Sequence, residues 1–538
     1  MLKNPLYIYG PKNVPVPSDL NFGSYILDSM WNHRDNVALI DGGTDEAITY
    51  KEIAQQSMNF AVSLTRMGVK KDDVVAIFSE NRKEFWGAVI GVACAGAVLT
   101  PINTAYVGDE MRHVLKISKP KYMIISPAMY KTHEKMLRSI DCIKKFIVFG
   151  NERYPITFSY DALAIADGRE MKDIKYENFM PVDVKGQTDT LLIVYSSGTT
   201  GLPKGVMLTH LNVILQCCMP SSHNPLEITI TITPWYHVMG FVGLLAGLAV
   251  GRTGIYFAKF DLELYLRTIE KYKAVQLTVV PPVLIAACKF PKKYDLSSVR
   301  LIYSGAAPLH KDTINAVPER FPNVQAVLQG YGSSEATLAL TRFSYDDYSI
   351  CKTGSVGKVV PGAIVKIVDT KTRKPLGPNQ QGEICAKGDV LMKGYVGKPR
   401  GDDFDDEGFY KTGDVGYYDE DGQFYITDRL KELIKYKAYQ VPPAELEAVL
   451  LQHEAIKDAG VVGIEDKSAG EVPLAFVVLQ PGKTASEQEI KDFIAERLSN
   501  PKHLRGGVRF LEQIPKTPSG KILRKDLKKL ATTGRSKL

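Results

Sequence analysis

The chain has 538 residues, of which 45% are hydrophobic and 24% are charged, and its formal net charge is +7 at pH 7. The length predicts two or three domains, and the globular-average composition allows a large buried core and argues against a disordered chain. The charge is local, because the segment from Asn500 to the end holds 11 Lys and Arg residues and 2 acidic residues. Phe510 is the only aromatic residue of that tail, so we expect a solvated basic helix and no nucleic-acid partner.

The sequence offers no signal peptide, disulfide framework or zinc site. Residues 1–15 lack the apolar core of a signal peptide. Residues 85–102 form the longest apolar run, which we interpret as a buried helix that continues into a strand rather than as a membrane span. The cysteines are scattered, odd in number and without a CxxC pair, so we expect free thiols in a reducing compartment. They are Cys94, Cys142, Cys217, Cys218, Cys288, Cys351 and Cys385.

Short β-branched runs alternate with helical patterns along the first three fifths of the chain. Helical stretches of ordinary length, such as residues 50–67 and 261–271, separate the runs. This alternation predicts an α/β fold with mostly parallel sheets and helices on both faces. The predicted strands are residues 74–78, 122–126, 146–149, 191–195, 276–280 and 301–303.

The sequence pattern changes after Lys352. Glycines at short intervals up to Gly394 predict a small distorted β-barrel or β subdomain. From about Asp428 a compact α+β region begins, with a helix predicted over residues 443–452 and a terminal helix. We therefore predict an N-terminal domain of residues 1–428 and a C-terminal domain of residues 429–538.

The stretch YSSGTTGLPKGVMLTH, residues 195–210, is the most informative motif. It joins a buried strand to a loop of hydroxyls and glycines that ends in a lysine. Hydroxyl and backbone donors can surround phosphate oxygens, and the lysine adds positive charge, so we predict a phosphate-binding loop. The glycine and lysine spacing excludes a Walker A loop. The predicted phosphate-binding residues are Ser196, Ser197, Gly198, Thr199, Thr200, Gly201 and Lys204.

This loop resembles the phosphate-binding signature of the adenylate-forming enzymes, which include acyl-CoA synthetases, beetle luciferases and nonribosomal adenylation domains. Further motifs of that family follow in order. Residues 330–335 (GYGSSE) match its YGxTE element, residues 410–414 (YKTGD) its YxTGD element, and residues 515–521 (PKTPSGK) the element that carries its C-terminal lysine. The stretch LKELIKYKAYQVPPAELE, with LRGGV and the SKL end, is similar to the insect luciferase-like and 4-coumarate-type branch.

The resemblance implies a fold and a nucleotide site. The fold would be two αβαβα-type sheets plus a distorted β-barrel in the N-terminal domain, with a small mobile C-terminal domain. Asp414 would bind the ribose hydroxyls with help from Arg429, and Glu335 would hold Mg²⁺ between the ATP phosphates, as a hard oxygen ligand should. Read singly, Asp414 could be a turn former and Glu335 a charge at a helix start. The remaining implied nucleotide contacts are Tyr331 against the adenine, Gly305, Ala306 and Ala307 as the other wall, Ser334 and Thr200 near phosphate and metal, and Gln329, Gly330 and Gly332.

The resemblance also implies two half-reactions, with ATP, Mg²⁺ and CoA as cosubstrates. Lys521 would stabilise charge while a carboxylate attacks the α-phosphorus of ATP. The C-terminal domain would then rotate about residues 428–431 and bring Lys435 and Lys437 to support attack by the CoA thiolate. A solvated lysine-rich strand explains that pair equally well from sequence alone. Ala438 stands where the family usually has glycine, and its added methyl group predicts slower transfer of the acyl group to CoA.

The acyl pocket would contain His237, Ala339 and three positions at which luciferases typically carry Arg, Phe and Ser. This chain has Gln216, Met239 and Leu338 there. These changes predict a more apolar and adaptable pocket, suited to a medium or long fatty acid. The alternatives are a luciferase that oxidises luciferyl adenylate with O₂, a 4-coumarate-type aryl-CoA ligase, and a non-catalytic binding protein of the same fold.

The chain ends in Ser536-Lys537-Leu538. This tripeptide is the address that the peroxisomal import receptor reads from a free C-terminus. The polar residues before it are consistent with an accessible tail. We therefore expect a peroxisomal protein whose other partners are a small carboxylic acid, ATP and CoA.

Overall fold

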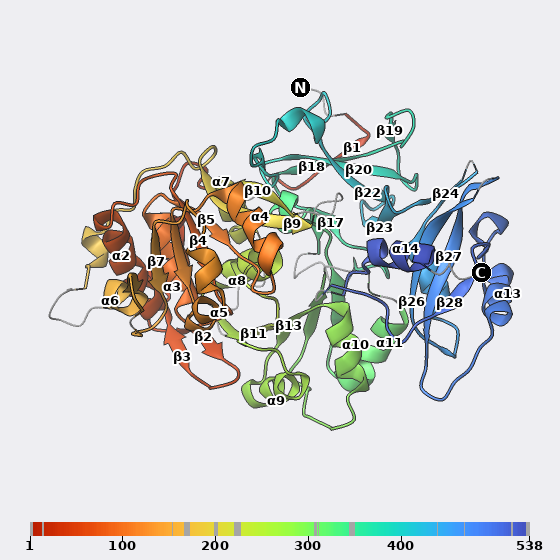
Figure 1. The fold of residues 1–538 in the computed structure, drawn as a ribbon, viewed down its shortest axis with the longest axis horizontal. Helices are drawn as coiled ribbons and strands as arrows, with labels where there is room; N and C mark the ends of the chain where they lie inside the picture. Colours follow the sequence, from red (N-terminus) through yellow and green to blue (C-terminus); the bar gives the residue numbers. More distant parts are fainter. Residues whose placement is uncertain are drawn as a thin grey trace.

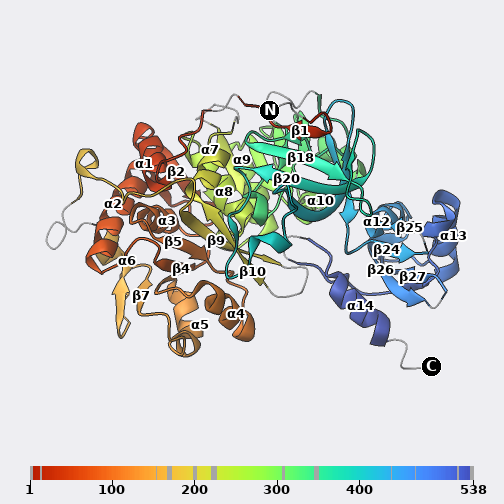
Figure 2. The ribbon, with the colours of Figure 1, turned by 90° about the horizontal axis from the view of Figure 1, so that it is seen from above.

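The computed structural model describes residues 4–12, 15–152, 154–165, 173–197, 203–219, 227–305, 309, 311–343, 350–437, 439–466, 468–517 and 520–533. Three large sheets build the N-terminal part of the molecule, and a smaller C-terminal part lies beside it (Figures 1 and 2). No described helix is long and apolar enough to cross a membrane. All seven cysteines are free, as predicted.

The first sheet has eight strands in the order β21-β10-β9-β5-β4-β6-β7-β8. Alternate residues of its central strand β4 enter different cores, since Val75 and Ile77 pack with α2 and α3 while Ala76 and Phe78 pack with α4 and α5. Helices therefore cover both faces, as the sequence predicted. The strands are β4 (Val74–Phe78), β5 (Val98–Pro101), β6 (Tyr122–Ile125), β7 (Lys145–Val148), β8 (Thr157–Ser159), β9 (Thr190–Ser197), β10 (Pro203–Thr209) and β21 (Gly394–Tyr395).

The second sheet has seven strands in the order β15-β14-β13-β11-β12-β2-β3. All its pairs are parallel except β2 with β3. The carboxyl end of β15 leads directly into Gly330, the start of the predicted nucleotide motif. The strands are β2 (Val37–Asp41), β3 (Ala47–Thr49), β11 (Ile228–Thr231), β12 (Thr253–Tyr256), β13 (Gln276–Val279), β14 (Leu301–Ser304) and β15 (Ala326–Gln329).

The third sheet occupies the region in which the glycine spacing predicted a distorted β-barrel. It has the order β1-β18-β20-β22-β23, with β19 paired to β18. Its strands are β1 (Tyr7–Tyr9), β18 (Ala363–Val368), β19 (Pro375–Leu376), β20 (Gly382–Gly388), β22 (Tyr410–Tyr418) and β23 (Phe424–Arg429). A separate short pair joins β16 (Thr341–Arg342) to β17 (Lys358–Val359).

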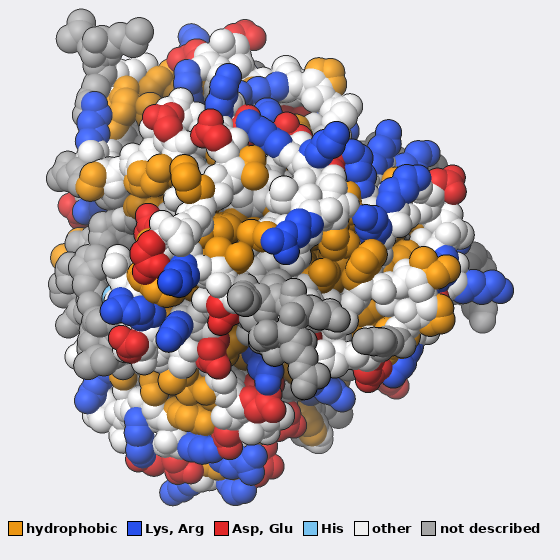
Figure 3. Space-filling view, turned by 90° about the vertical axis from the view of Figure 1, so that its left-hand side faces the viewer, with side chains coloured by type: hydrophobic (Ala, Val, Ile, Leu, Met, Phe, Trp, Pro, Cys, Tyr) orange, Lys and Arg blue, Asp and Glu red, His pale blue; other side chains and the backbone are white. Residues whose placement is uncertain are grey.

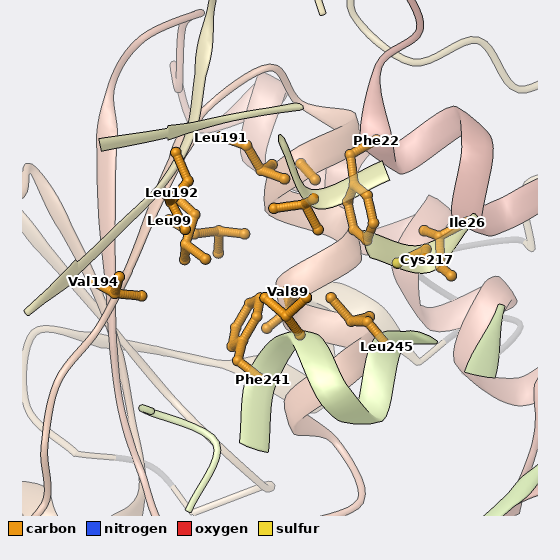
Figure 4. Packing of buried hydrophobic residues seen from close by; sticks show 14 of the residues in the cluster. Phe22, Ile26, Val89, Leu99, Leu191, Leu192, Val194, Cys217, Phe241 and Leu245 are labelled. Atoms are coloured by element: carbon orange, nitrogen blue, oxygen red, sulfur yellow. The ribbon is translucent and has the colours of Figure 1, made fainter. Parts of the chain in front are cut away.

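The helices of the N-terminal part meet in a large apolar core. In Figure 4, Phe22 and Ile26 of α1, Val89 of α3 and Phe241 and Leu245 of α8 point toward one another beside strands of the first sheet. The surface in Figure 3 carries basic and acidic side chains side by side. The helices are α1 (Phe22–Asn32), α2 (Tyr50–Arg66), α3 (Phe85–Cys94), α4 (Gly108–Ser118), α5 (Pro127–Leu137), α6 (Tyr160–Ala164), α7 (His210–Cys217), α8 (Val238–Leu248), α9 (Leu262–Tyr272), α10 (Pro281–Lys289) and α11 (Lys311–Arg320), with the short 3₁₀ turns η1 (Tyr176–Asn178), η2 (Ser334–Ala336) and η4 (Arg400–Asp402).

The C-terminal part has a sheet and hydrophobic clusters of its own. The sheet order is β25-β24-β27-β26, with β28 paired to β27. The elements are β24 (Ile434–Tyr436), β25 (Tyr439–Val441), α12 (Pro443–Leu450), β26 (Ile456–Asp466), β27 (Gly470–Leu479), α13 (Glu487–Arg497), η5 (Asn500–Lys502), β28 (Val508–Phe510) and α14 (Arg524–Thr533). The sequence predicted a compact α+β region with a terminal helix in this part of the chain.

A buried ionic cluster joins the last helix to the start of the C-terminal part. The Arg524 guanidinium lies 3.0 Å from Glu447 of α12 and 3.4 Å from Glu432. The second Glu447 oxygen accepts a hydrogen bond from the Val461 amide at 2.8 Å. Burial raises the pKa of Glu447 to about 7 even though Arg524 opposes the shift. The desolvation of this carboxylate therefore outweighs its ion pair.

Glu447→Gln is expected to remove a pH-dependent loss of stability. The pKa of Glu447 is about 7 in the folded protein and 4.5 in the unfolded chain, so the protonated side chain stabilises the folded state. That stabilisation is lost as the pH rises from about 4.5 to 7. We therefore compare the free energy of unfolding of E447Q with that of the wild type at two pH values. The difference should be about 2–3 kcal/mol more favourable to E447Q at pH 8 than at pH 5. Calorimetric melting at both pH values measures this, with Glu454→Gln at an exposed ion pair as the control. Equal differences at the two pH values would contradict it.

Candidate active site

Asp414 is held by an ion pair and a hydrogen bond at the centre of the site. It is the register partner of Arg429 in the pair β22–β23, and the Arg429 Nε forms an ion pair with its Oδ1 at 2.9 Å. The Tyr331 hydroxyl donates to its Oδ2 at 2.7 Å. Burial raises the pKa of Asp414, while Arg429 and Tyr331 favour its ionised form. Each carboxylate oxygen retains a second lone pair, so the group can accept from two neighbouring hydroxyls such as those of a ribose.

The segment after β15 makes a tight turn that requires glycine. A Cβ on Gly332 would lie 1.9 Å from the Leu338 carbonyl oxygen, so the turn closes on itself at this position. Leu338 has a φ of 133° and Thr337 a φ of 57°, both uncommon for side chains of their kind. The Thr337 hydroxyl anchors the turn by donating to the Val390 carbonyl at 2.7 Å. The same turn therefore carries Ser334, Glu335 and the strained Leu338.

Other predicted nucleotide residues lie around this turn. The Gln329 Oε1 accepts from the Leu309 amide at 3.2 Å, so its side chain supports the neighbouring segment. Gly330 lies at the strand end, where an added Cβ would be 3.4 Å from the Thr341 oxygen. Gly305 follows β14, whereas Ala306 and Ala307 lie outside the described residues.

Glu335 is a buried carboxylate within the site. Its Oε1 accepts from the Tyr395 hydroxyl at 2.8 Å, and its charge raises the pKa of Asp414, so the two carboxylates share one region. The described residues contain no group of three or more His, Cys, Asp and Glu side chains able to hold a metal. A single hard oxygen ligand fits Mg²⁺ that takes its other ligands from substrate phosphates and water.

The predicted phosphate-binding loop is described only at its two ends. Ser196 and Lys204 are register partners across β9 and β10, and the buried Ser196 hydroxyl has no hydrogen-bond partner among the described residues. Ser197 pairs with Pro203 in the same ladder. The Lys204 Nζ lies 4.5 Å from the centroid of the Tyr395 ring. Predictions for Gly198, Thr199, Thr200 and Gly201 fall outside the described residues.

Lys521 reaches the site from the C-terminal part. Burial and the neighbouring Arg429 lower the pKa of Lys521, whereas Glu432 and Asp414 favour its ammonium form. Thr517 fixes the loop, since its hydroxyl accepts from the Lys521 amide at 3.1 Å. The structure therefore brings this lysine together with the Asp414–Arg429 pair.

The loop that carries Lys521 also contacts α10 of the N-terminal part. Gly520 has a φ of 86°, and a Cβ added there would lie 2.4 Å from the Pro282 Cγ. The backbone thus approaches Pro282 too closely for any side chain. This contact holds the lysine loop against the larger part of the molecule.

The other predicted catalytic lysines lie elsewhere. Lys435 is exposed on β24, and its amide donates to Glu471 at 2.8 Å. Lys437 is exposed, with its Nζ 5.5 Å from the centroid of the Tyr436 ring. The contacts found for the described residues join neither lysine to Asp414 or Glu335. Ala438 lies outside the described residues.

The acyl side of the predicted site begins at α8. His237 precedes the helix with an exposed side chain whose ring centroid lies 4.7 Å from that of Tyr236, and desolvation lowers the pKa of its imidazole. The Met239 methyl carbon lies 3.4 Å from the position of a Cβ on Gly305. The residues predicted for the acyl and adenine walls therefore adjoin, as a reaction between a carboxylate and ATP would require. Ala339 packs half-buried beside the main core.

Gln216, predicted for the acyl pocket, holds the backbone of a neighbouring turn. It is buried on α7, and its Nε2 donates to the carbonyls of Ala339 at 3.2 Å and Ala336 at 3.4 Å. It thereby supports the turn that carries Leu338. Its Oε1 is buried without a hydrogen-bond partner among the described residues.

Tyr395 is a site residue that the sequence prediction missed. It contacts both the predicted metal ligand Glu335 and the predicted phosphate lysine Lys204. Its strand β21 has two residues, too short for a periodic signal. The sequence around it, KGYVGKP, contains one glycine on each side as its only local signal.

Comparisons with known proteins agree with this geometry. Residues 28–396 match the family described as AMP-binding enzyme, and residues 445–521 match its C-terminal domain. 4-Coumarate–CoA ligase 1 of Petroselinum crispum is 39% identical over 98% of this chain and 96% of its own length. Luciferin 4-monooxygenase of Luciola mingrelica is 38% identical over 93% of both chains. The ATP-bound MatB structure from Rhodopseudomonas palustris superposes with a TM-score of 0.84 at 26% identity, covering 95% of this chain and 99% of MatB. The chain therefore belongs to the AMP-binding enzyme family.

Proposed function

We propose that this protein is an ATP-dependent acid–thiol ligase that activates a medium- or long-chain fatty acid. One arrangement supports the first step most directly: the loop that carries Lys521 packs against Pro282 of the N-terminal part, and the charges of Lys521 and Asp414 affect each other's pKa. A cation held next to a ribose-binding carboxylate is suited to the negative charge that develops at the α-phosphate. The 4-coumarate–CoA ligase relatives support the acid–thiol chemistry.

The reaction would proceed in two steps. A carboxylate oxygen of the acid attacks the α-phosphorus, the bond from that phosphorus to the bridging oxygen breaks, and pyrophosphate leaves. The CoA thiolate then attacks the acyl carbon, and AMP leaves with the oxygen that joined it to the acyl group. Asp414 and Arg429 would position the nucleotide and Lys521 would stabilise the first transition state, while Mg²⁺ bound with ATP would neutralise phosphate charge near Glu335.

The preference for a fatty acid is supported by one face of α8. Met239, Gly243, Ala246 and Gly247 share that face and are not buried, whereas Phe241 and Leu245 pack into the core. Among the described residues, nothing lies within 4 Å of a Cβ added to Gly243 or Gly247. From Met239 to Gly247 the helix rises about 12 Å, enough to lie along an extended acyl chain.

A pyrophosphate-release assay over graded fatty acids and cinnamic acids, with and without CoA, tests this function. The proposal expects release with medium and long saturated acids and formation of the acyl-CoA when CoA is present. Release with cinnamic acids alone would assign the protein to aryl-CoA ligation instead. A lack of release with every acid would leave only a binding protein of this fold.

Gly243→Leu is expected to shorten the range of acids that the enzyme accepts. A leucine would fill space along the open face of α8, so kcat/KM for a long acid should fall about 10-fold or more, as for a pocket that has lost room for a few methylenes. A short acid should be affected little and serves as the internal control. Pyrophosphate release with both acids measures the change. An equal loss with both acids would contradict the placement of the chain along α8.

A luciferase is the second candidate, because beetle luciferases are among the relatives. Gln216 places a neutral amide, occupied by backbone carbonyls, where luciferases typically carry an arginine. This difference favours the ligase. Photon counting with luciferin, ATP and Mg²⁺ against a Lys521→Ala control decides between the two, since strong lysine-dependent light would reverse the order.

We also propose a peroxisomal location, on the basis of Ser536-Lys537-Leu538. These residues lie outside the described part of the chain. A fluorescent protein fused to the N-terminus should enter peroxisomes with the full chain and stay outside them when the last three residues are removed. Uptake by both forms would contradict the proposal.

A further inference from the structure

A short segment, Met392 to Val396, connects the two halves of the predicted phosphate site. The Met392 amide donates to the Glu335 carbonyl at 2.8 Å, and the Val396 amide donates to the Gly205 carbonyl at 2.8 Å. Between these bonds, Tyr395 is the register partner of Val206 in β10. The backbone thus ties the turn that carries Glu335 to the strand that carries Lys204.

The Tyr395 side chain contacts both charged groups at once. Its hydroxyl donates to the Glu335 Oε1 at 2.8 Å, and its ring centroid lies 4.5 Å from the Lys204 Nζ. The side chain is 5% exposed, and a second hydroxyl, that of Tyr410, lies 3.3 Å from its own. Burial and the charge of Glu335 raise the pKa of Tyr395, so the phenol remains a hydrogen-bond donor.

Lys204 and Glu335 contact the same side chain and carry opposite charges, so they attract each other. A direct Lys204–Glu335 ion pair would occupy the groups predicted to bind phosphate and metal. In the described structure the two form no ion pair, and the only carboxylate within 4.0 Å of the Lys204 Nζ is Asp403, at 3.9 Å. The ring face offers the ammonium a cation–π contact, while the hydroxyl offers the carboxylate a charge-assisted hydrogen bond.

We propose that Tyr395 is a positioning residue that keeps Glu335 and Lys204 apart and presents both to the phosphates and metal of MgATP. This inference rests on the proposed function, because it takes the ligand between the two groups to be MgATP. Without the hydroxyl, the buried carboxylate loses its donor and is free to turn toward Lys204. Without the ring as well, nothing among the described contacts separates the two charges.

Two variants separate these roles. Tyr395→Phe keeps the ring and removes the hydroxyl, whereas Tyr395→Leu removes both. Titration of Mn²⁺ by electron paramagnetic resonance, in the presence of the non-hydrolysable α,β-methylene-ATP, measures metal binding without turnover. We expect Mn²⁺ to bind Y395F about 10-fold more weakly, the loss typical of a buried hydrogen bond to a charged group.

Isothermal titration calorimetry with α,β-methylene-ATP in the presence of EDTA gives the affinity for the metal-free nucleotide. Y395F should bind the metal-free analogue nearly as the wild type does, whereas Y395L should lose affinity for both analogue and metal. Tyr418→Phe, a buried tyrosine of β22 with no hydroxyl partner among the described residues, is the matched control and should change neither. Far-ultraviolet circular dichroism and melting temperature verify that each variant is folded.

Wild-type Mn²⁺ affinity in folded Y395F would overturn the proposal, as would equal effects of Y395F and Tyr418→Phe. The proposed function can fail separately. If the wild type binds Mn²⁺ with the analogue but releases pyrophosphate with no acid, the ligase assignment fails while the result for Tyr395 stands. If the wild type does not bind Mn²⁺ with the analogue, the inference for Tyr395 fails on its own terms.

Discussion

Lys521→Ala is expected to slow acyl-adenylate formation about 100- to 1,000-fold, the usual effect of removing one preorganised donor from a developing negative charge. The half-buried lysine interacts electrostatically with Asp414 and Arg429, and a water molecule in its place would supply no comparable charge. Single-turnover release of pyrophosphate from ATP and a fatty acid measures the loss. ATP binding should change little, because Asp414, Tyr331 and Arg429 remain in place.

The pH dependence of the same step follows from the lowered pKa of Lys521. The ammonium is the active form, so the adenylation rate should fall as pH rises through a value below the usual 10.5. K521A should lack this descending limb.

Two further measurements make the Lys521 result specific. Lys525→Ala, an exposed lysine of α14, should leave the adenylation rate unchanged. Formation of acyl-CoA from synthetic acyl adenylate and CoA should survive in K521A, because the lysine serves the first step. An equal loss in both half-reactions would contradict the role assigned to Lys521.

The sequence predicts the parallel sheets well, because each strand is a short run of apolar residues between breakers. The run predicted over residues 74–78 is the strand β4 (Val74–Phe78), and the other five predicted strands differ from the structure by one or two residues at their ends. Local patterns cannot show how distant segments pair. β1 joins β18, with Tyr7 opposite Lys366, and β21 joins β10, with Tyr395 opposite Val206.

The site is predictable where its residues form ordered motifs. Tyr331, Asp414 and Arg429 belong to separate motifs, and the structure brings all three together. Tyr395 could not be found in this way, because its role depends on partners 60 and 191 positions away in the sequence. For Gln216 the sequence predicted the region of the site but not the hydrogen bonds, because its amide donates to backbone carbonyls. Only the folded turn creates those acceptors.

Gly520→Ala is expected to lower the adenylation rate about 100-fold while the second half-reaction is retained. The added methyl group would lie 2.4 Å from the Pro282 Cγ and 2.8 Å from its Cδ, so the lysine loop must move away from α10. A displacement of about 1 Å at the neighbouring catalytic group is enough for a loss of that size. Alanine at a φ of 86° adds about 1 kcal/mol of backbone strain.

A double mutant separates the collision from the strain. Pro282→Ala removes the two ring atoms that the new methyl group would meet, so G520A/P282A should recover much of the adenylation rate lost in G520A, although the strain persists. P282A alone should cost little, since the substituted residue lies in the first turn of α10, where alanine is well tolerated. Pyrophosphate release and transfer of synthetic acyl adenylate to CoA, measured in all three variants, test this. If the double mutant were no faster than G520A, the loss would come from the backbone of the loop itself, and the Gly520–Pro282 contact would not be what positions Lys521.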